Sequence, residues 1–212
     1  MAKVLRFLAW TCLILGAITG VLRLTVIRWW QVPLGDPYLE ASLAPNLRGG
    51  DWVILWRGTA PIEGNLVLCP EPKAPERQVI ARIVGEGSDH VTINSGDLFV
   101  QKRRFETDDN CDRFSVRNPD TGQTVDQGCE LEKVGGVTHP RGDVRQDLPA
   151  PKSVDIDVPP QHVFLASDNR QFPWDSREFG PVPRETCSET IVYRLVSKDG
   201  FFDVANRLML IR

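Results

Sequence analysis

The sequence predicts a mainly β protein, with an antiparallel β-sheet body that follows one N-terminal transmembrane helix. Three observations predict this fold: an uncharged run near the N-terminus, short apolar segments separated by turn residues, and 16 prolines and 17 glycines among 212 residues. Proline and glycine interrupt helices and form turns, so this content favours short strands. Hydrophobic residues at 42% and charged residues at 25% are ordinary for a globular chain.

The N-terminal helix is expected to run from Val4 to Ile27. Its uncharged core, Phe7 to Leu22, is shorter than the about 20 residues that a membrane span needs. The long side chains of Arg6 and Arg23 can reach the membrane interface from just inside a span, and the Trp29-Trp30 pair follows where an aromatic belt would lie. A cleavable signal peptide is the alternative, but no small-x-small cleavage site follows the run.

Two cysteines of the body, Cys111 and Cys129, flank a polar loop rich in Asp, Asn and Gly. Because such a loop has no apolar core, a disulfide there would contribute about 3 kcal/mol of stability. Two free surface thiols are the alternative. A disulfide requires an oxidising compartment, so this pair predicts a body outside the cytoplasm.

The orientation of the helix is weakly encoded in its flanking charges. Lys3 and Arg6 precede the uncharged run, and Arg23 and Arg28 follow it, so the basic-residue rule barely decides. The prediction of localisation therefore depends on the predicted disulfide. We expect a single-pass membrane protein whose body lies on the extracytoplasmic side, as in a bacterial inner membrane with the body in the periplasm.

Charge and residue clusters exclude several kinds of partner. The formal net charge of −3 provides no basic face for nucleic acid. No CxxC pair or His/Cys cluster indicates a metal site, and we expect no cofactor. Membrane lipid, contacted through the N-terminal helix, is the partner that the composition itself predicts.

Seven segments of the body have the apolar pattern of strands. They are residues 51–56, 64–69 (ended by Pro70), 78–84, 90–94 and 97–101 (a hairpin around Ser95-Gly96), 161–166, and 190–196 as the last strand. Residues 102–160 are polar and rich in Asp, Gly, Pro and Arg. The predicted organisation is an anchor at 1–30, a β core formed by 31–101 and 161–212, and a partly irregular insertion at 102–160.

Two segments stand out for their residue order. Residues 41–47 read Ala-Ser-Leu-Ala-Pro-Asn-Leu, with Gly50-Asp51 after them, and residues 167–182 read Ser-Asp-Asn-Arg-Gln-Phe-Pro-Trp-Asp-Ser-Arg-Glu-Phe-Gly-Pro-Val. They resemble boxes of the signal peptidase I family, Ser-Met-x-Pro-Thr-Leu with Gly-Asp, and Gly-Asp-Asn-Arg-x-x-Ser-x-Asp-Ser-Arg-x-x-Gly-x-Val. Between them, residues 64–67 and 79–85 resemble the family's Gly-Asp-Ile-Val and Ile-Lys-Arg-Val-Ile-Gly boxes. The resemblance covers residues 4–196, weakly through the insertion.

The resemblance implies acyl transfer by a serine–lysine pair, in which a lysine of lowered pKa takes the serine's proton. The serine position is Ser42. The lysine position is Ala81, which cannot accept a proton. Its neighbour Arg82 cannot replace a base, because a guanidinium stays protonated and the side chain points to the opposite face of a strand.

Three further positions depart from the family pattern. Pro173 replaces the serine that orients the lysine, and Glu40 stands where some members have a hydroxyl that helps to hold the oxyanion. A carboxylate there would repel developing negative charge. Ser167 replaces a glycine, which leaves the local backbone angle open because glycine tolerates positive φ.

Four other residues are candidates for a substitute base. Lys73, Lys102 and His90 are expected to be solvated, and His162 has no counterpart in the family. The polar box itself is expected to support the floor of the active site through buried ion pairs and backbone hydrogen bonds, with a solvated turn as the alternative. Its members are Asp168, Asn169, Arg170, Asp175, Ser176 and Arg177.

The resemblance thus implies a membrane-bound serine endopeptidase that would cleave signal sequences from exported proteins. We expect its activity to be weak or absent, because alanine occupies position 81, where the family has the general-base lysine. The alternative is an inactive homologue that binds exported segments or a partner protein. Signal-peptide-bearing or other exported polypeptides are the implied partners in both cases.

Overall fold

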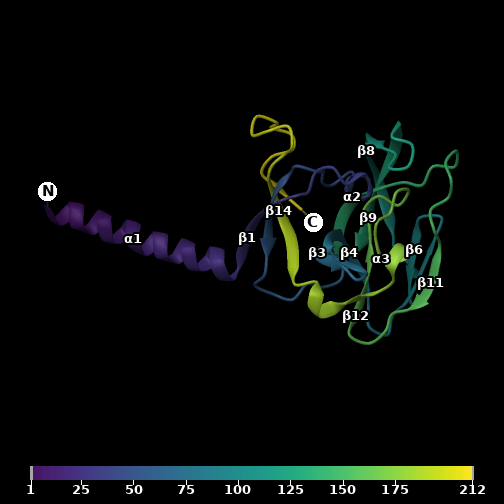
Figure 1. Ribbon diagram of the computed structural model, residues 1–212, viewed down its shortest axis with the longest axis horizontal. Coiled ribbons are helices and arrows are strands. Elements are labelled where there is room, and N and C mark those ends of the chain that lie inside the picture. The colour runs from purple at the N-terminus through teal and green to yellow at the C-terminus, as the bar shows by residue number, and fades with distance from the viewer. Residues whose placement is uncertain (1, 212) are drawn as a thin grey trace.

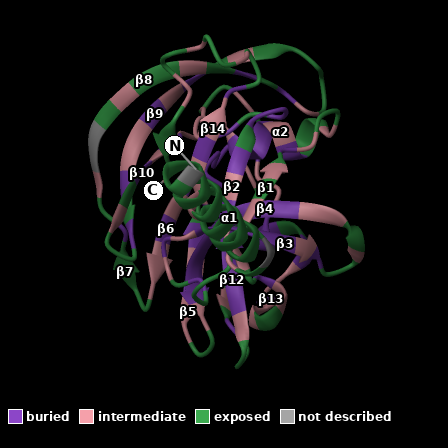
Figure 2. Cartoon of the chain, turned by 90° about the vertical axis from the view of Figure 1, so that its left-hand side faces the viewer, coloured by how far each residue is buried: buried purple, intermediate pink, exposed green. Residues whose placement is uncertain are grey.

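One helix projects from a body built of antiparallel sheets in the computed structural model, which describes residues 2–211 (Figure 1). Helix α1 spans Ala2–Thr25, and its segment Lys3–Arg23 is long and apolar enough to cross a membrane. The body covers none of this segment, and Figure 2 shows the helix exposed along its length. The predicted end at Ile27 is wrong, because strand β1 (Ile27–Gln31) begins there and pairs with β2 (Trp52–Trp56).

The two tryptophans after α1 face different surroundings because β1 alternates its side chains. Trp29 is 54% exposed, and the guanidinium of Arg23 lies 5.0 Å from its ring centroid. Trp30 is instead partly buried and packs against the core.

The largest sheet places antiparallel strands in the order β1-β2-β14-β3-β4-β12-β13, with β15 paired to β14. The further members are β3 (Leu66–Glu71), β4 (Ala74–Glu86), β12 (His162–Ala166), β13 (Val182–Pro183), β14 (Glu189–Val196) and β15 (Met209–Leu210). Two predictions about these strands are wrong. Pro70 does not end β3, which continues to Glu71, and β14 is followed by β15.

Two smaller sheets complete the body. One has the order β10-β9-β8, and the other β11-β5-β6-β7. Their members are β5 (His90–Asn94), β6 (Asp97–Val100), β7 (Arg103–Arg104), β8 (Thr107–Arg117), β9 (Thr124–Val134), β10 (Val137–Gly142) and β11 (Val154–Asp157). The segment 102–160, expected to be partly irregular, therefore contains paired strands over much of its length.

Three short helices connect the strands: α2 (Pro37–Leu43), α3 (Ser176–Phe179) and the 3₁₀ turn η1 (Arg184–Thr186). Asp36 begins α2, and its Oδ1 accepts hydrogen bonds from the main-chain N–H groups of Tyr38 and Leu39 at 3.0 and 3.2 Å. Aspartate favours this position because its side chain satisfies N–H groups that lack partners in the first turn. The cap fixes the start of the helix that carries Ser42.

Strand β4 alternates between separate parts of the core. Val79, Ala81 and Ile83 lie in an apolar cluster with residues of β3 and β12, whereas Ile80 packs with Leu39 and Leu43 of α2. Because successive side chains of a strand point to opposite faces, β4 contributes to both sides of the sheet. This central strand thus links the helix of Ser42 to the apolar cluster around Ala81.

Two disulfides cross-link the body. Cys111 and Cys129 stand opposite each other on β8 and β9, with a Cα–Cα distance of 5.0 Å. The pair therefore lies within a strand ladder, and not across the structureless loop that the composition suggested. Cys69 of β3 is bonded to Cys187, at a sequence separation of 118.

Candidate active site

Ser42 lies in the last turn of α2 and is fully buried. Its hydroxyl donates a hydrogen bond to the carbonyl of Leu39 at 2.9 Å. This is a local bond of the kind that serine forms with its own helix. The proton that a nucleophilic serine must lose is therefore held by a main-chain carbonyl, which is not a base.

Ala81 lies in the middle of β4, fully buried, opposite Val67 of β3. The apolar cluster around it includes Val163, Leu165 and Phe179, with Trp174 packed against its edge. Helix α2 contacts β4, so the serine position and the alanine position belong to adjoining elements. A methyl group among apolar neighbours offers no proton acceptor.

Arg82, the next residue, belongs to the other face of β4. Its Nε donates to Asp168 Oδ1 at 2.7 Å, and its Nη1 donates to the carbonyl of Gly64 at 2.8 Å. Arg82 and Asp168 are both about 1% exposed, so this is a buried ion pair with additional hydrogen bonds. Removing one partner of such a buried pair is strongly destabilising, because the other charge is left without compensation.

The polar box and the Ser42 segment are joined directly. Asn46 donates through Nδ2 to Asp168 Oδ2 at 2.6 Å and to the carbonyl of Pro140 at 2.7 Å. The main-chain N–H of Asn169 donates to the carbonyl of Ser42 at 3.1 Å. Two segments that are far apart in the sequence therefore fix each other's position at the candidate nucleophile.

The second half of the box is held by a carboxylate at the start of α3. Asp175 accepts bonds from the main-chain N–H of Ser167 at 2.6 Å and from Arg177 Nη2 at 2.7 Å, and all three residues are buried. Although burial opposes ionisation, Arg177 and the main-chain donors lower the pKa of Asp175. Ser176 accepts a hydrogen bond from the N–H of Leu165 at 3.0 Å. The box is thus a buried network and not a solvated turn.

A histidine that the sequence did not single out lies inside this network. His139 of β10 is fully buried, and its Nε2 lies 3.5 Å from both Glu132 Oε2 and Asp168 Oδ1. Neither contact is a hydrogen bond, and both carboxylates are already paired, Glu132 with Arg170 and Asp168 with Arg82. Burial, followed by the nearby guanidinium groups, lowers the pKa of His139 well below its usual value, so the imidazole is neutral.

The residues of this site lie within a region of the chain that matches a known protein family. The family model for signal peptidase, peptidase S26, matches residues 4–196. The chain belongs to the signal peptidase family. No curated protein matches it in a sequence comparison.

In this signal peptidase homologue, the positions that depart from the family pattern have other contacts. Pro173 is half-buried, and the hydroxyl of Ser167 accepts a hydrogen bond from the N–H of Trp174 at 3.1 Å. Ser167 is not among the described residues with positive φ, so a serine fits its backbone. Glu40 accepts a hydrogen bond from the N–H of Gly35 at 2.8 Å, which directs its carboxylate toward that loop.

The two histidines named from the sequence as substitute bases have partners elsewhere in the homologue. His90 is near two carboxylates, with Nδ1 2.7 Å from Asp157 Oδ1, and the hydrogen bond to Asp157 raises its pKa. His162 Nδ1 lies 2.9 Å from the carbonyl of Pro160. Lys73 and Lys102 are exposed. Among the described side chains, no group of three or more His, Cys, Asp or Glu residues could hold a metal.

Proposed function

We propose that this protein is a membrane-anchored signal peptidase homologue with at most weak endopeptidase activity toward the signal sequences of exported proteins. The observation that carries the proposal is the state of Ser42, whose hydroxyl donates to Leu39 while the lysine position is a buried alanine. Removing a general base commonly lowers a rate by about 10²–10⁴-fold.

The retained frame supports the second part of the proposal, which is binding of exported segments. Arg82–Asp168 and Asp175–Arg177 are buried ion pairs, and Asn46, in the loop after Ser42, donates a hydrogen bond to Asp168 of the polar box. These contacts hold the site together without needing a proton acceptor. A homologue with this frame can position a polypeptide even when it does not cleave it.

We further propose that residues 1–30 anchor the protein and that the body lies on the extracytoplasmic side. Signal-peptide-bearing polypeptides are the proposed substrates or ligands. The apolar segment Lys3–Arg23 and the two disulfides support this placement, since disulfides persist in oxidising compartments.

The test is cleavage of a purified pre-protein by the natural chain, Ala81→Lys, Pro173→Ser and the double variant. We expect the natural chain to be slow or inactive. Ala81→Lys alone should restore little, because a lysine without an orienting hydroxyl can miss the serine by an ångström or more, which is costly. The double variant should exceed either single change.

Ser42→Ala provides the blank, and Ala81→Met controls for the added side-chain length without an amine. Thermal unfolding of every variant shows whether it folds. Rapid cleavage by the natural chain that Ser42→Ala abolishes would overturn the proposal, because a different base would then have to serve Ser42. Binding of the pre-protein by Ser42→Ala, measured on immobilised protein, tests the binding function separately.

A further inference from the structure

We infer that an extended, acidic polypeptide segment binds along the edge of β8, in a groove between this strand and α2. The groove has a volume of about 870 Å³. Residues 113–119 line one wall, and residues of α2 and the following loop line the other. This inference goes beyond the proposed function, since it does not depend on whether Ser42 cleaves a peptide.

The strand edge supplies the first argument. β8 is the outer member of the β10-β9-β8 sheet, and within residues 2–211 it pairs only with β9. Five consecutive residues, 113–117, line the groove. Consecutive residues point to opposite faces of a strand, so they share a groove when it runs along the strand's edge. An open edge recruits extended segments through its main-chain N–H and C=O groups.

Charge supplies the second argument. Arg48, Arg113, Arg117 and Lys198 line the groove, and Glu40 is the one acidic residue among its described lining. This concentration of positive charge contrasts with the formal net charge of −3 for the whole chain. The exposed ion pair between Arg48 and Asp199 is weak in water, so it leaves Arg48 able to exchange partners.

The floor of the groove is apolar, which limits the partner further. Ala41 of α2 and Val116 of β8 pack together, with Phe114 beside them, and all three line the groove. A cationic rim over an apolar floor fits a strand in which acidic residues alternate with small apolar ones. Because Ala41 directly precedes Ser42 and Ala44 follows it by two residues, such a segment would lie along the helix of the candidate nucleophile.

The experiment uses the full chain in detergent micelles and a fluorescein-labelled peptide of twelve residues that alternates Glu or Asp with Ala or Val. Fluorescence anisotropy gives the dissociation constant. We expect the double variant Arg113→Glu/Arg117→Glu to weaken binding by about tenfold or more, because two attractions become repulsions. A peptide with Lys in place of each acidic residue should not bind.

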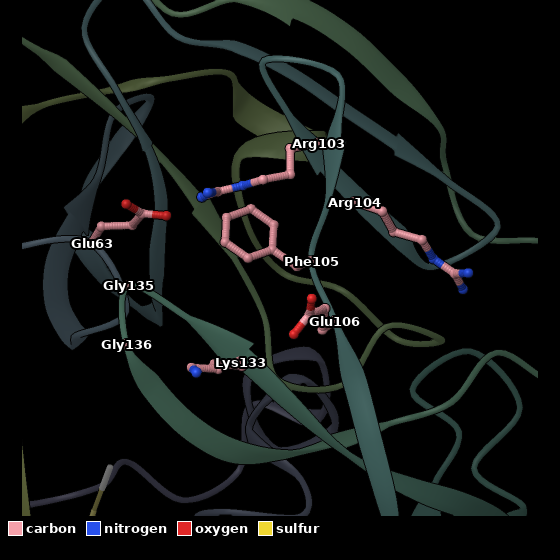
Figure 3. Close-up of a pocket in the computed structure, with 8 residues that line it drawn as sticks. All are labelled: Glu63, Arg103, Arg104, Phe105, Glu106, Lys133, Gly135 and Gly136. Atoms are coloured by element: carbon pink, nitrogen blue, oxygen red, sulfur yellow. The ribbon is translucent and has the colours of Figure 1, made fainter.

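A second pair of neighbouring arginines, on another part of the surface, provides a matched control for the charge reversal. Arg103 and Arg104 belong to a separate cavity of about 430 Å³, where Arg103 extends over Phe105 toward Glu63 and Arg104 points away (Figure 3). Arg103→Glu/Arg104→Glu makes the same change in net charge, and we expect it to alter the dissociation constant less than about twofold. Equal weakening by both pairs would show unspecific attraction and overturn the inference.

The mode of binding is tested with peptides N-methylated on alternate amides. A segment added to a strand edge uses one set of amides, so methylation of one alternate set should abolish binding and methylation of the other should preserve it. Binding that survives both modifications would contradict strand addition. If Arg113→Glu/Arg117→Glu reduces binding to phosphatidylglycerol vesicles and leaves peptide binding unchanged, the ligand is a lipid surface and the inference is wrong. If Arg113→Glu/Arg117→Glu does not fold, the neutral variant Arg113→Gln/Arg117→Gln takes its place in these measurements.

Discussion

Asp168 joins several elements of the candidate site through its buried carboxylate. Its two carboxylate oxygens accept hydrogen bonds from Arg82 of β4 and from Asn46 of the loop after α2. His139 of β10 lies 3.5 Å away. One buried side chain therefore positions the strand of Ala81 and the loop after Ser42 relative to the polar box.

We expect Asp168→Ala to lower the free energy of unfolding by about 3–5 kcal/mol, because it leaves the buried guanidinium of Arg82 without its carboxylate. Urea unfolding of the protein in micelles measures this. The matched control is Asp199→Ala, which removes the exposed partner of Arg48 and should cost no more than about 1 kcal/mol. Similar losses for the two variants would contradict a special role for the buried pair.

His139 gives the site a defined pH dependence. Its folded pKa is lowered, so below the usual histidine pKa of about 6.5 the unfolded chain binds a proton that the folded chain does not. Above about pH 6.5 His139 does not reduce the free energy of unfolding. Below this pH the free energy of unfolding falls as the pH decreases, by at most about 1.4 kcal/mol per pH unit from this group. Arg82, Arg141 and Arg170 repel the added proton, against the attraction of Glu132 and Asp168.

The variant His139→Gln has no titrating imidazole, so its stability should fall less steeply than that of the natural chain between pH 6.5 and 5. Thermal midpoints measured across this window provide the comparison. The carboxylates titrate in both proteins, so they cancel in the difference. Identical slopes would show that His139 does not carry the effect.

The sequence could identify Ser42 and the polar box because their residues follow one another in fixed order. It could not identify His139 and Glu132, for a physical reason. Strand β9 buries Gln127 and Glu132 as well as Val134, so its buried face has no apolar alternation to be read. A buried polar side chain whose partner is far away in the sequence, such as Glu132 with Arg170, has the same sequence pattern as a solvated one.

At the scale of elements, the β8–β9 pair shows what cross-strand contacts add to a polar segment. Cys111 and Cys129 are directly opposite each other, and Cys129 is buried. The composition suggested an irregular insertion here, because polarity hides strand pairing when one side of a sheet faces solvent. Strand ends were likewise hard to predict, since β3 tolerates Pro70 next to the β4 hairpin.

We expect Cys111→Ser/Cys129→Ser to lower the free energy of unfolding by about 3 kcal/mol, since the bridge closes a loop of 18 residues. Protein isolated from its native compartment should gain alkylation at these two thiols only after reduction and unfolding. Mass spectrometry of the peptides distinguishes them from Cys12, which is free and exposed on α1. Alkylation of both without reductant would rule the bridge out.

At the scale of the whole molecule, α1 stands apart from the sheets and continues directly into β1 (Figure 1). The turn between them is short, so the body must lie close to whichever membrane face the helix leaves. The sequence identified the apolar helix, because a long uncharged run is a strong signal and needs no tertiary contact to be recognised. It missed β1, whose first residue it placed in the helix.

We expect protease added to intact spheroplasts to digest the body, because the proposed placement exposes it on the extracytoplasmic face. Immunoblotting with an antibody against the body follows its loss, and a cytoplasmic protein in the same cells reports on leakage. Complete protection until the membrane is permeabilised would place the body in the cytoplasm.

The disulfide between Cys69 and Cys187 determines what happens when the backbone between these residues is cut. Any single cut between these residues, including one in the β8–β9 hairpin, leaves two pieces that are still joined through sulfur. The piece that contains the polar box, whose last residues precede Cys187, would stay attached to the anchored piece that contains Ser42. A nicked molecule would therefore keep both halves of its site at the membrane, and only a reducing gel would reveal that its backbone had been broken.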